Sequence, residues 1–307
     1  MDYKNNIDEI LKEGYDYLKK GLIDEAQEIY LNGLKTHPDN ISLINNLAQT
    51  YAMTGDKRKS KDYHKKLIAL CDKDDSPEML MLKGNSLMSI NNITDALEAY
   101  EKVLDKNPQN IPALFQISAI FQEKEDFEKS NKHLNLILLQ ESGNVLALIN
   151  KGMNYSKMEN YQKAQECYDK VLEISPRHEE ATRLKGELLK QIGDEDSLKE
   201  HIKKTLEINP DSAYIIMLKA MEYANADDDK ALEFFNRAIA IDPDFDEAYF
   251  NKAGYLMLKK RFDEAIECYK QAFEINPESG GIIDREGLFE LLNQMKNAAK
   301  GRKYAES

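Results

Sequence analysis

Small residues recur at intervals of 33 to 36 positions along almost the whole of this 307-residue chain. This first ladder comprises Gly14, Ala48, Gly84, Ser118, Gly152, Gly186, Ala220, Ala253 and Gly287. A second ladder at matching intervals comprises Ala26, Ser60, Ala96, Ser130, Ala164, Leu198, Ala231 and Ala265. Self-similarity at such a period indicates one supersecondary unit repeated along the chain, so the fold has to be built by stacking.

Residues 145–178 show what the repeated unit is. Small and large apolar residues follow helical spacing in two stretches, with Asn160 at the turn between them and Pro176 at the end. The first stretch carries Leu148, Gly152 and Tyr155, and the second carries Ala164, Tyr168 and Val171. Because glycine and alanine have almost no side chain, two helices can cross closely there, and the tyrosines fill the space beside them. The unit is therefore predicted to be a pair of antiparallel helices.

A single pair of helices cannot bury both of its faces, but stacked pairs share one continuous core. The sequence therefore predicts an all-α fold, an α–α superhelix of about eight helix pairs. We expect a polar tail at residues 1–6, eight repeats over residues 7–279, and a C-terminal capping helix with a short basic tail over residues 280–307. The repeats start near residues 7, 41, 77, 111, 145, 179, 213 and 246.

The regular pattern is interrupted by two inserted residues near 71–77, by one lost residue near 226–229, in the sixth unit and at the C-terminus. In the sixth unit, Leu198 and Ile202 replace the expected alanine and aromatic residue, so its helices should splay slightly. After residue 280 only one helix follows, and its apolar side should cover the open end of the last unit. We expect the covering residues to be Ile282, Ile283, Leu288 and Leu291.

These features resemble the tetratricopeptide repeat family. The resemblance rests on the 34-residue period, the small residue of the first helix, the alanine of the second, the aromatic residue four positions later and the closing proline. Residues 96–104, 164–172 and 265–273 carry the pattern most clearly. The resemblance covers residues 7–279. It implies a right-handed solenoid in which the first helices line a concave groove that binds segments of partner proteins.

Charge and composition exclude several classes of protein. The net charge is −13, with 55 acidic and 42 basic residues, and a chain this acidic repels a phosphate backbone, so no nucleic-acid partner is expected. No apolar run approaches twenty residues, so no membrane span is expected, and the N-terminus lacks the features of a signal peptide. The three cysteines have no metal-site or redox spacing. We expect a cytoplasmic protein.

The side chains that carry chemistry show no recognisable arrangement. None of the five histidines pairs with another histidine, cysteine or glutamate at ligand spacing, and the phosphate-binding and nucleophile motifs are absent from the sequence. The abundant carboxylates are interpreted as a solvated surface. The prediction is therefore a protein that is not an enzyme, with no catalytic residue, no metal and no cofactor.

The first helices carry a row of apolar residues that predicts a binding groove. The row consists of Met81, Phe115, Ile149, Met217 and Phe250, interrupted by Arg183, with Met153 and Met221 beside it. Contiguous exposed apolar surface marks interaction sites, and methionine adapts to partners of varied shape. The alternative is that these side chains fill the gaps between neighbouring first helices and meet no ligand.

The adjacent first-helix position carries four side-chain amides, namely Asn46, Gln116, Asn150 and Asn251. An amide both donates and accepts hydrogen bonds, so it can pair with the backbone of an extended peptide whatever the peptide's sequence. The alternative is that asparagine is simply common at this place in the repeat.

The function predicted from these features is a non-catalytic scaffold or adaptor that binds protein or peptide partners in its concave groove. The alternative is a self-associating structural protein, or a regulatory subunit of an enzyme or multiprotein complex, for example one accessory to a glycosyltransferase. A homo-oligomer belongs to this alternative.

Overall fold

A computed structural model describes residues 6–224, 228–281 and 284–305, except for the side chains of residues 228 and 299–305. Within these residues the chain forms seventeen helices and no strand. The helices fall into two compact units, residues 1–158 and 159–307. The predicted all-α fold is confirmed, whereas the division into eight repeats and a cap stays a prediction.

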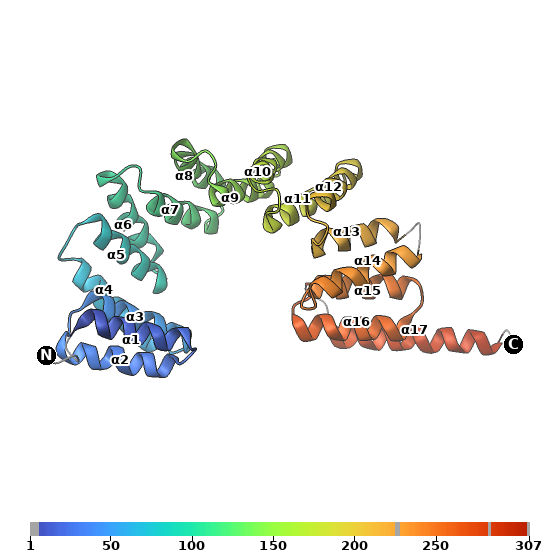
Figure 1. Cartoon of the computed structure of the whole chain (residues 1–307), viewed down its shortest axis with the longest axis horizontal. Helices are drawn as coiled ribbons and strands as arrows, with labels where there is room; N and C mark the ends of the chain where they lie inside the picture. Colours follow the sequence, from blue (N-terminus) through green and yellow to red (C-terminus); the bar gives the residue numbers. More distant parts are fainter. Residues whose placement is uncertain (1–5, 225–227, 282–283, 306–307) are drawn as a thin grey trace. The chain divides into compact units, whose positions relative to one another are not determined.

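The first unit contains nine helices, in which α1 pairs with α2, α3 with α4, α5 with α6 and α7 with α8 (Figure 1). Their bounds are α1 Ile7–Lys19, α2 Ile23–Thr36, α3 Ile41–Met53, α4 Lys57–Cys71, α5 Pro77–Ser89, α6 Ile93–Lys106, α7 Ile111–Glu123, α8 Phe127–Gln140 and α9 Val145–Lys157. Each pair packs on the next through its second helix, as α4 packs on α5.

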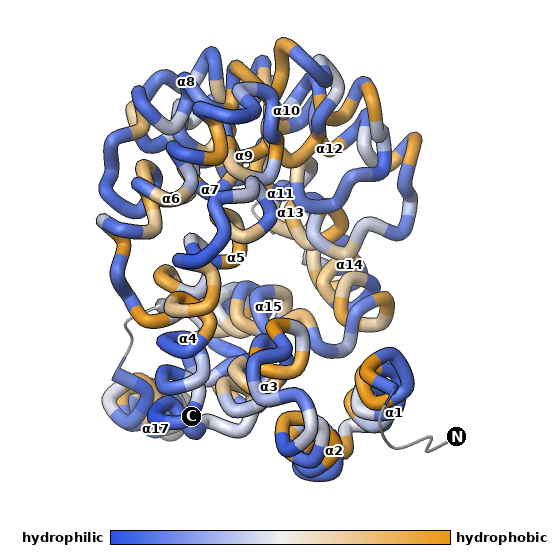
Figure 2. Tube along the Cα trace, turned by 90° about the vertical axis from the view of Figure 1, so that its left-hand side faces the viewer, coloured by the Kyte–Doolittle hydropathy of each residue, from blue (hydrophilic) through white to orange (hydrophobic). Residues whose placement is uncertain are grey.

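The second unit repeats this arrangement, with α11 paired with α12, α13 with α14, and α15 with α16. Its helices are α10 Tyr161–Ile174, α11 Glu179–Ile192, α12 Glu195–Ile208, α13 Ala213–Tyr223, α14 Asp228–Ile241, α15 Asp246–Leu258, α16 Phe262–Ile275 and α17 Arg285–Ala305. Hydrophobic and hydrophilic residues alternate within the turns of the helices (Figure 2). Most helices therefore have an apolar side that they bury against their neighbours.

Many of the helices begin at asparagine or aspartate caps. The side chains of Asn40, Asn110 and Asn144 each accept a hydrogen bond from the backbone N–H three residues ahead, at 2.9 to 3.0 Å. Asp56 does the same at the start of α4, at 3.0 Å. Such caps satisfy N–H groups that have no partner within the helix, and each stabilises the fold by about 0.5–2 kcal/mol. Between the helices of a pair, Asn91 turns the chain with a φ of 63°.

In two pairs of the first unit, a tyrosine of the second helix lies against a glycine of the first. Tyr30 covers Gly14 and Tyr100 covers Gly84, and both tyrosines are fully buried. A Cβ atom added to either glycine would lie under 3.0 Å from carbon atoms of the ring, closer than real side chains approach. The two helices can therefore cross at this distance only because the first one has no side chain there.

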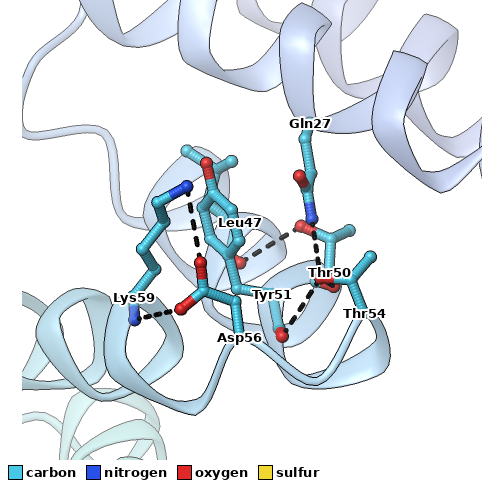
Figure 3. A network of polar contacts seen from close by, with 7 residues as sticks. All are labelled: Gln27, Leu47, Thr50, Tyr51, Thr54, Asp56 and Lys59. Atoms are coloured by element: carbon cyan, nitrogen blue, oxygen red, sulfur yellow. Dashed lines mark hydrogen bonds and ion pairs between the residues drawn. The ribbon is translucent and has the colours of Figure 1, made fainter.

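Polar contacts hold the turn between α3 and α4 and join it to the preceding pair (Figure 3). The Thr50 hydroxyl donates to the backbone oxygen of Leu47 at 3.1 Å, and Gln27 of α2 donates to the Thr54 hydroxyl at 3.4 Å. The Asp56 carboxylate, which caps α4, also pairs with the Lys59 ammonium at 3.4 Å. The hydrogen bond from the backbone N–H of Lys59 is the main cause of the lowered pKa of Asp56.

A buried amide network joins α7, α8 and α9 in the first unit. The Asn154 amide donates to the Ser130 hydroxyl and to Asn131 Oδ1, each at 2.9 Å, and accepts from Gln122 Nε2 at 2.7 Å. Every polar atom of this buried side chain thus has a partner, as burial requires. Removing one partner would leave a buried group unpaired, so the network specifies how these helices pack.

The α11/α12 pair lacks the aromatic residue that most other pairs carry on the second helix, and whether its helices splay stays a prediction. Ile202 is buried in the place of the usual tyrosine, and Gly186 is covered instead by Tyr214 of the following pair. A cleft of about 620 Å³ lies here, with walls that include Asp169 of α10 and His201 of α12.

The C-terminal helix α17 packs on α16, but not in the predicted orientation. Leu292 is fully buried in the cluster formed with α15 and α16, and Leu288 packs against the same cluster. Leu291, which we expected to be covered, is 50% exposed, so that prediction is wrong. One residue along a helix rotates the side chain by about 100°, and the apolar side of α17 is centred on Leu288 and Leu292. Ile282 and Ile283 lie outside the described residues.

The packing of tyrosine on glycine predicts the effect of adding one methyl group. Gly84→Ala should destabilise the fold by about 1–3 kcal/mol, because the new Cβ atom overlaps the ring of Tyr100 in a filled core. Gly254→Ala is the matched control, since its Cβ atom would lie 3.6 Å from the nearest atom, the Tyr269 hydroxyl oxygen. Alanine favours the helix over glycine by about 0.5–1 kcal/mol, so Gly254→Ala should stabilise.

Guanidinium denaturation of both variants checks this prediction. If Gly84→Ala were as stable as the unchanged chain, or if both variants were destabilised equally, the close helix crossing would be contradicted.

Candidate protein-binding surface

The structure does not present the predicted apolar row as an exposed surface. Ile149 is 2% exposed and Met217 is 0% exposed, so neither can contact a partner, and the prediction is wrong for these two residues. Met81, Phe115 and Phe250 are half-buried and pack against the core clusters between neighbouring helices. The Phe250 ring, for example, meets the Tyr269 ring edge-on with centroids 5.0 Å apart. Filling gaps between helices is the main role of this row.

The two methionines beside the row are different. Met153 on α9 is 39% exposed, and Met221 on α13 is 36% exposed. Each lies four residues after a buried member of the row, Ile149 or Met217, one turn further along the same helix. Apolar surface that a partner could cover is therefore found at this later position.

The four predicted amides are all half-buried, but their hydrogen-bonding states differ. Asn251 Nδ2 already donates to the backbone oxygen of Glu247 at 2.8 Å and to Met217 Sδ at 3.4 Å. Asn46 lies beside the buried Tyr30 phenol, whose pKa is raised by burial and lowered in part by this amide. The side chains of Gln116 and Asn150 have no hydrogen-bond partner among the described residues. These two keep donors and acceptors for a ligand.

Asn85 is a further amide of this face that the sequence reasoning missed. It is exposed on α5, and its Oδ1 atom accepts a hydrogen bond from the Tyr100 hydroxyl at 2.8 Å. Burial of the ring raises the pKa of Tyr100 to about 12, so the phenol remains a donor at neutral pH. The bond orients the amide and leaves its N–H groups toward solvent. The sequence signal that could have identified Asn85 is its position directly after Gly84, a member of the first ladder of small residues.

We define the amide surface as Asn85, Gln116, Asn150 and Met153, on the first helices α5, α7 and α9 of the first unit. Gln122 of α7 donates to the backbone oxygen of Asn150 at 3.4 Å, which places α7 next to α9. Met81 of α5 packs in one cluster with Ile117 and Ile120 of α7, which places α5 next to α7. The surface thus crosses three neighbouring helices.

A second polar site lies in the second unit. A cleft of about 470 Å³ lies between the first turn of α15 and the chain after α16, and it is lined by Asp246, Glu247, Phe250, Asn251, Asn276, Glu278, Ser279 and Gly280. Asp246 accepts a hydrogen bond from Asn276 Nδ2 at 2.9 Å. Burial raises the pKa of Glu247, and the nearby Lys190 of α11 opposes this shift. The sequence reasoning had placed the carboxylates in general on a solvated surface.

Outside these two surfaces, two histidines and the three cysteines are buried in the core. His64 is buried in the slot of an aromatic residue, and burial lowers its pKa. The ring of His201 is hydrogen-bonded through Nε2 to the backbone oxygen of Thr182 at 3.0 Å. The three cysteines are buried and form no disulfide among the described residues. Within the part of the chain that the structure describes, no three histidine, cysteine or acidic residues are grouped as metal ligands, and no helix has the length and apolar character of a membrane span.

Comparison with known proteins identifies the repeat. Tetratricopeptide repeat models match residues 77–110, 145–178 and 246–279. The crystal structure of a tetratricopeptide repeat protein from Parabacteroides merdae superposes with a TM-score of 0.55 over 94% of this chain and 98% of that one, at 17% sequence identity. The chain is a tetratricopeptide repeat protein. At this identity the superposition speaks for the fold alone.

Two curated relatives of this tetratricopeptide repeat protein are much longer than it is. Anaphase-promoting complex subunit 3 of Schizosaccharomyces pombe is 24% identical over 302 residues, which are 96% of this chain and 45% of that protein. The human protein O-mannosyl-transferase TMTC1 is 25% identical over 230 residues, which are 72% of this chain and 25% of that protein. The chain thus spans less than half of either relative. Tetratricopeptide repeat proteins generally bind other proteins, which supports an interaction scaffold in general terms.

The raised pKa of Glu247 predicts a pH-dependent stability. A carboxyl group whose pKa is raised by folding favours the folded state while it is protonated, and this contribution is lost as the pH rises through the raised pKa. Glu247→Gln does not titrate, so it should be more stable than the unchanged chain at pH 7, and this advantage should shrink toward pH 4.

Glu264→Gln is the matched control of opposite sign, because the hydrogen bond from Arg261 lowers the pKa of Glu264. This contribution is present at neutral pH and is lost on acidification, so the variant should be slightly less stable at pH 7. Urea denaturation of the three proteins at both pH values is the measurement. A Glu247→Gln variant less stable than the unchanged chain at pH 7 would contradict the burial of an unpaired charge.

Proposed function

We propose that this tetratricopeptide repeat protein is a non-catalytic scaffold that binds an extended segment of a partner protein across the amide surface of its first unit. The observation that carries the proposal is the unused hydrogen-bonding capacity of the Gln116 and Asn150 side chains. Both amides are half-buried, and neither side chain has a hydrogen-bond partner among the described residues. Partly burying such a group without a partner costs free energy, which a bound peptide backbone would recover.

The neighbouring residues suit an extended peptide. Asn85 offers N–H donors from α5, held in orientation by the Tyr100 hydroxyl. Met153 offers an exposed, flexible apolar side chain three residues after Asn150, on the same side of α9. Amides that pair with a peptide backbone and a methionine that covers side chains of varied shape would bind segments of more than one sequence.

Peptides selected from a random display library on the full chain test this proposal. The double variant Gln116→Ala with Asn150→Ala should weaken the best peptide by about five- to 150-fold, because each hydrogen bond contributes about 0.5–1.5 kcal/mol. Met153→Glu should also weaken it, by placing a charge where an apolar contact forms. Affinities are measured by isothermal titration or fluorescence anisotropy.

Gln140→Ala is the control for the double variant, since Gln140 is an exposed amide on the second helix α8. It should leave the affinity unchanged. If no peptide were selected, or if the selected peptides bound the double variant as tightly as the unchanged chain, the amide surface would not be the binding site.

A second candidate function is that of a self-associating or regulatory subunit. Leu291 and Met295 of α17 are exposed one turn apart on one side of the helix, and an apolar pair of this kind can be covered by another protein or by a second copy. One relative is itself a subunit of the anaphase-promoting complex, and another is a mannosyl-transferase. Light scattering at several concentrations would show a constant monomer mass if the second-copy form of this candidate is wrong.

A further inference from the structure

The cleft at the start of α15 holds polar groups that the fold leaves without partners. We call it the acidic cleft and define it by Asp246, Glu247, Asn251, Asn276, Glu278 and Ser279, all in the second unit. Ser279 is 3% exposed, yet its hydroxyl oxygen is buried with no hydrogen-bond partner among the described residues. Because Ser279 also lines the cleft, its hydroxyl is a donor and acceptor that a group bound in the cleft would satisfy.

The Glu247 carboxylate is the second group without a partner. It forms no hydrogen bond or ion pair with any described residue, although it is half-buried. By contrast, the neighbouring Asp246 carboxylate accepts from Asn276 Nδ2 at 2.9 Å. Lys190 and Arg183 act on this carboxylate at a distance, but neither forms an ion pair with it, so a positively charged ligand in direct contact would be favoured. This observation is independent of the Ser279 hydroxyl.

The groups left over in the acidic cleft are almost all hydrogen-bond acceptors. Asn251 uses its Nδ2 donors on the Glu247 backbone and on Met217, so its Oδ1 atom remains. The Glu278 side chain is exposed and has no partner among the described residues. A ligand that matches this set must carry positive charge and several N–H donors. A guanidinium group has five such donors in one plane.

Phe250 adds an aromatic wall to the acidic cleft. A guanidinium group stacks favourably on an aromatic ring, which distinguishes it from a strongly hydrated ammonium group or a metal ion. The chain after α16 comes close to this wall at Gly280, where an added Cβ atom would overlap the Phe250 ring. Among the described residues the carboxylates are not grouped as metal ligands, so a divalent cation is the poorer match.

We propose that the acidic cleft is a subsite for an arginine side chain of a partner segment that lies along the first helices of the second unit. This inference rests on the proposed function only in that the chain binds an extended segment of a partner protein, and it concerns different residues. The exposed Met221 on α13 and the half-buried Asn251 on α15 belong to the same set of first-helix positions and offer contacts for the rest of the segment.

Nuclear magnetic resonance titration of the full chain with Nα-acetyl-arginine amide tests the subsite. The expected result is saturable shifts of the Gly280 and Gly281 backbone amides and of the Asn251 and Asn276 side-chain amides. Nα-acetyl-citrulline amide has the same shape without the charge, and it should bind at least about tenfold more weakly, as expected for the loss of a charged hydrogen-bond donor. Equal binding of the two probes would overturn the proposal.

Two variants separate a built site from the general attraction of an acidic protein. Glu247→Gln should weaken the arginine probe at least about tenfold, because hydrogen bonds to charged groups are the stronger ones, and Ser279→Ala should weaken it by a smaller factor. Glu233→Gln removes the same charge from an exposed position on α14 and should have no effect. If Glu233→Gln weakened binding as much as Glu247→Gln, the attraction would be non-specific and the proposal wrong. Circular dichroism of each variant verifies that it is folded.

The outcomes for the acidic cleft and for the amide surface can be told apart. If display peptides bind the amide surface but the arginine probe does not saturate, the arginine subsite alone is wrong. If the arginine probe binds as expected but no peptide depends on Gln116 and Asn150, only the proposed function of the first unit is wrong.

Discussion

In two helix pairs of the first unit, the ring of a buried tyrosine on the second helix lies directly against a glycine of the first helix. This contact sets how closely the two helices of a pair approach, because neither side can change without moving the other. In the α5/α6 pair the hydroxyl group of this tyrosine also donates a hydrogen bond to Asn85, which is exposed on α5. A core contact thus also orients a polar group on the surface where we place the partner.

The stacked helices leave different side chains accessible in the two units. On the first unit the accessible polar groups are neutral amides, and Gln116 and Asn150 keep their full hydrogen-bonding capacity. On the second unit the acidic cleft combines a carboxylate and a buried hydroxyl that lack partners among the described residues. The first set suits a peptide backbone of any sequence, and the second suits one basic side chain. The two surfaces are therefore suited to different kinds of contact with a partner.

The sequence predicted the helices and the contacts within a pair, because these depend on local spacing. The ladder of small residues predicted a close helix crossing at positions such as Gly84, although the ring of Tyr100 was expected beside the glycine and lies directly against it. The exposure of the apolar row was not predictable in this way. Met217 and Met221 lie on one side of α13, and only the position of the neighbouring helices determines which of them is buried. Leu291 was wrongly expected to be buried for a related reason. Only the packing of α17 on α16 determines which side of the helix faces the core. Glu247 gave no signal, because most carboxylates are solvated.

The contact between the tyrosine ring and the glycine is what sets the geometry of a helix pair. A double-mutant cycle with Gly84→Ala and Tyr100→Leu tests this most directly, by denaturation of the two single variants and the double variant. We expect a coupling of about 1–3 kcal/mol, with the added methyl group tolerated once the ring is gone, because the two side chains compete for one space. Destabilisations that add to within about 0.5 kcal/mol would contradict this role of the contact.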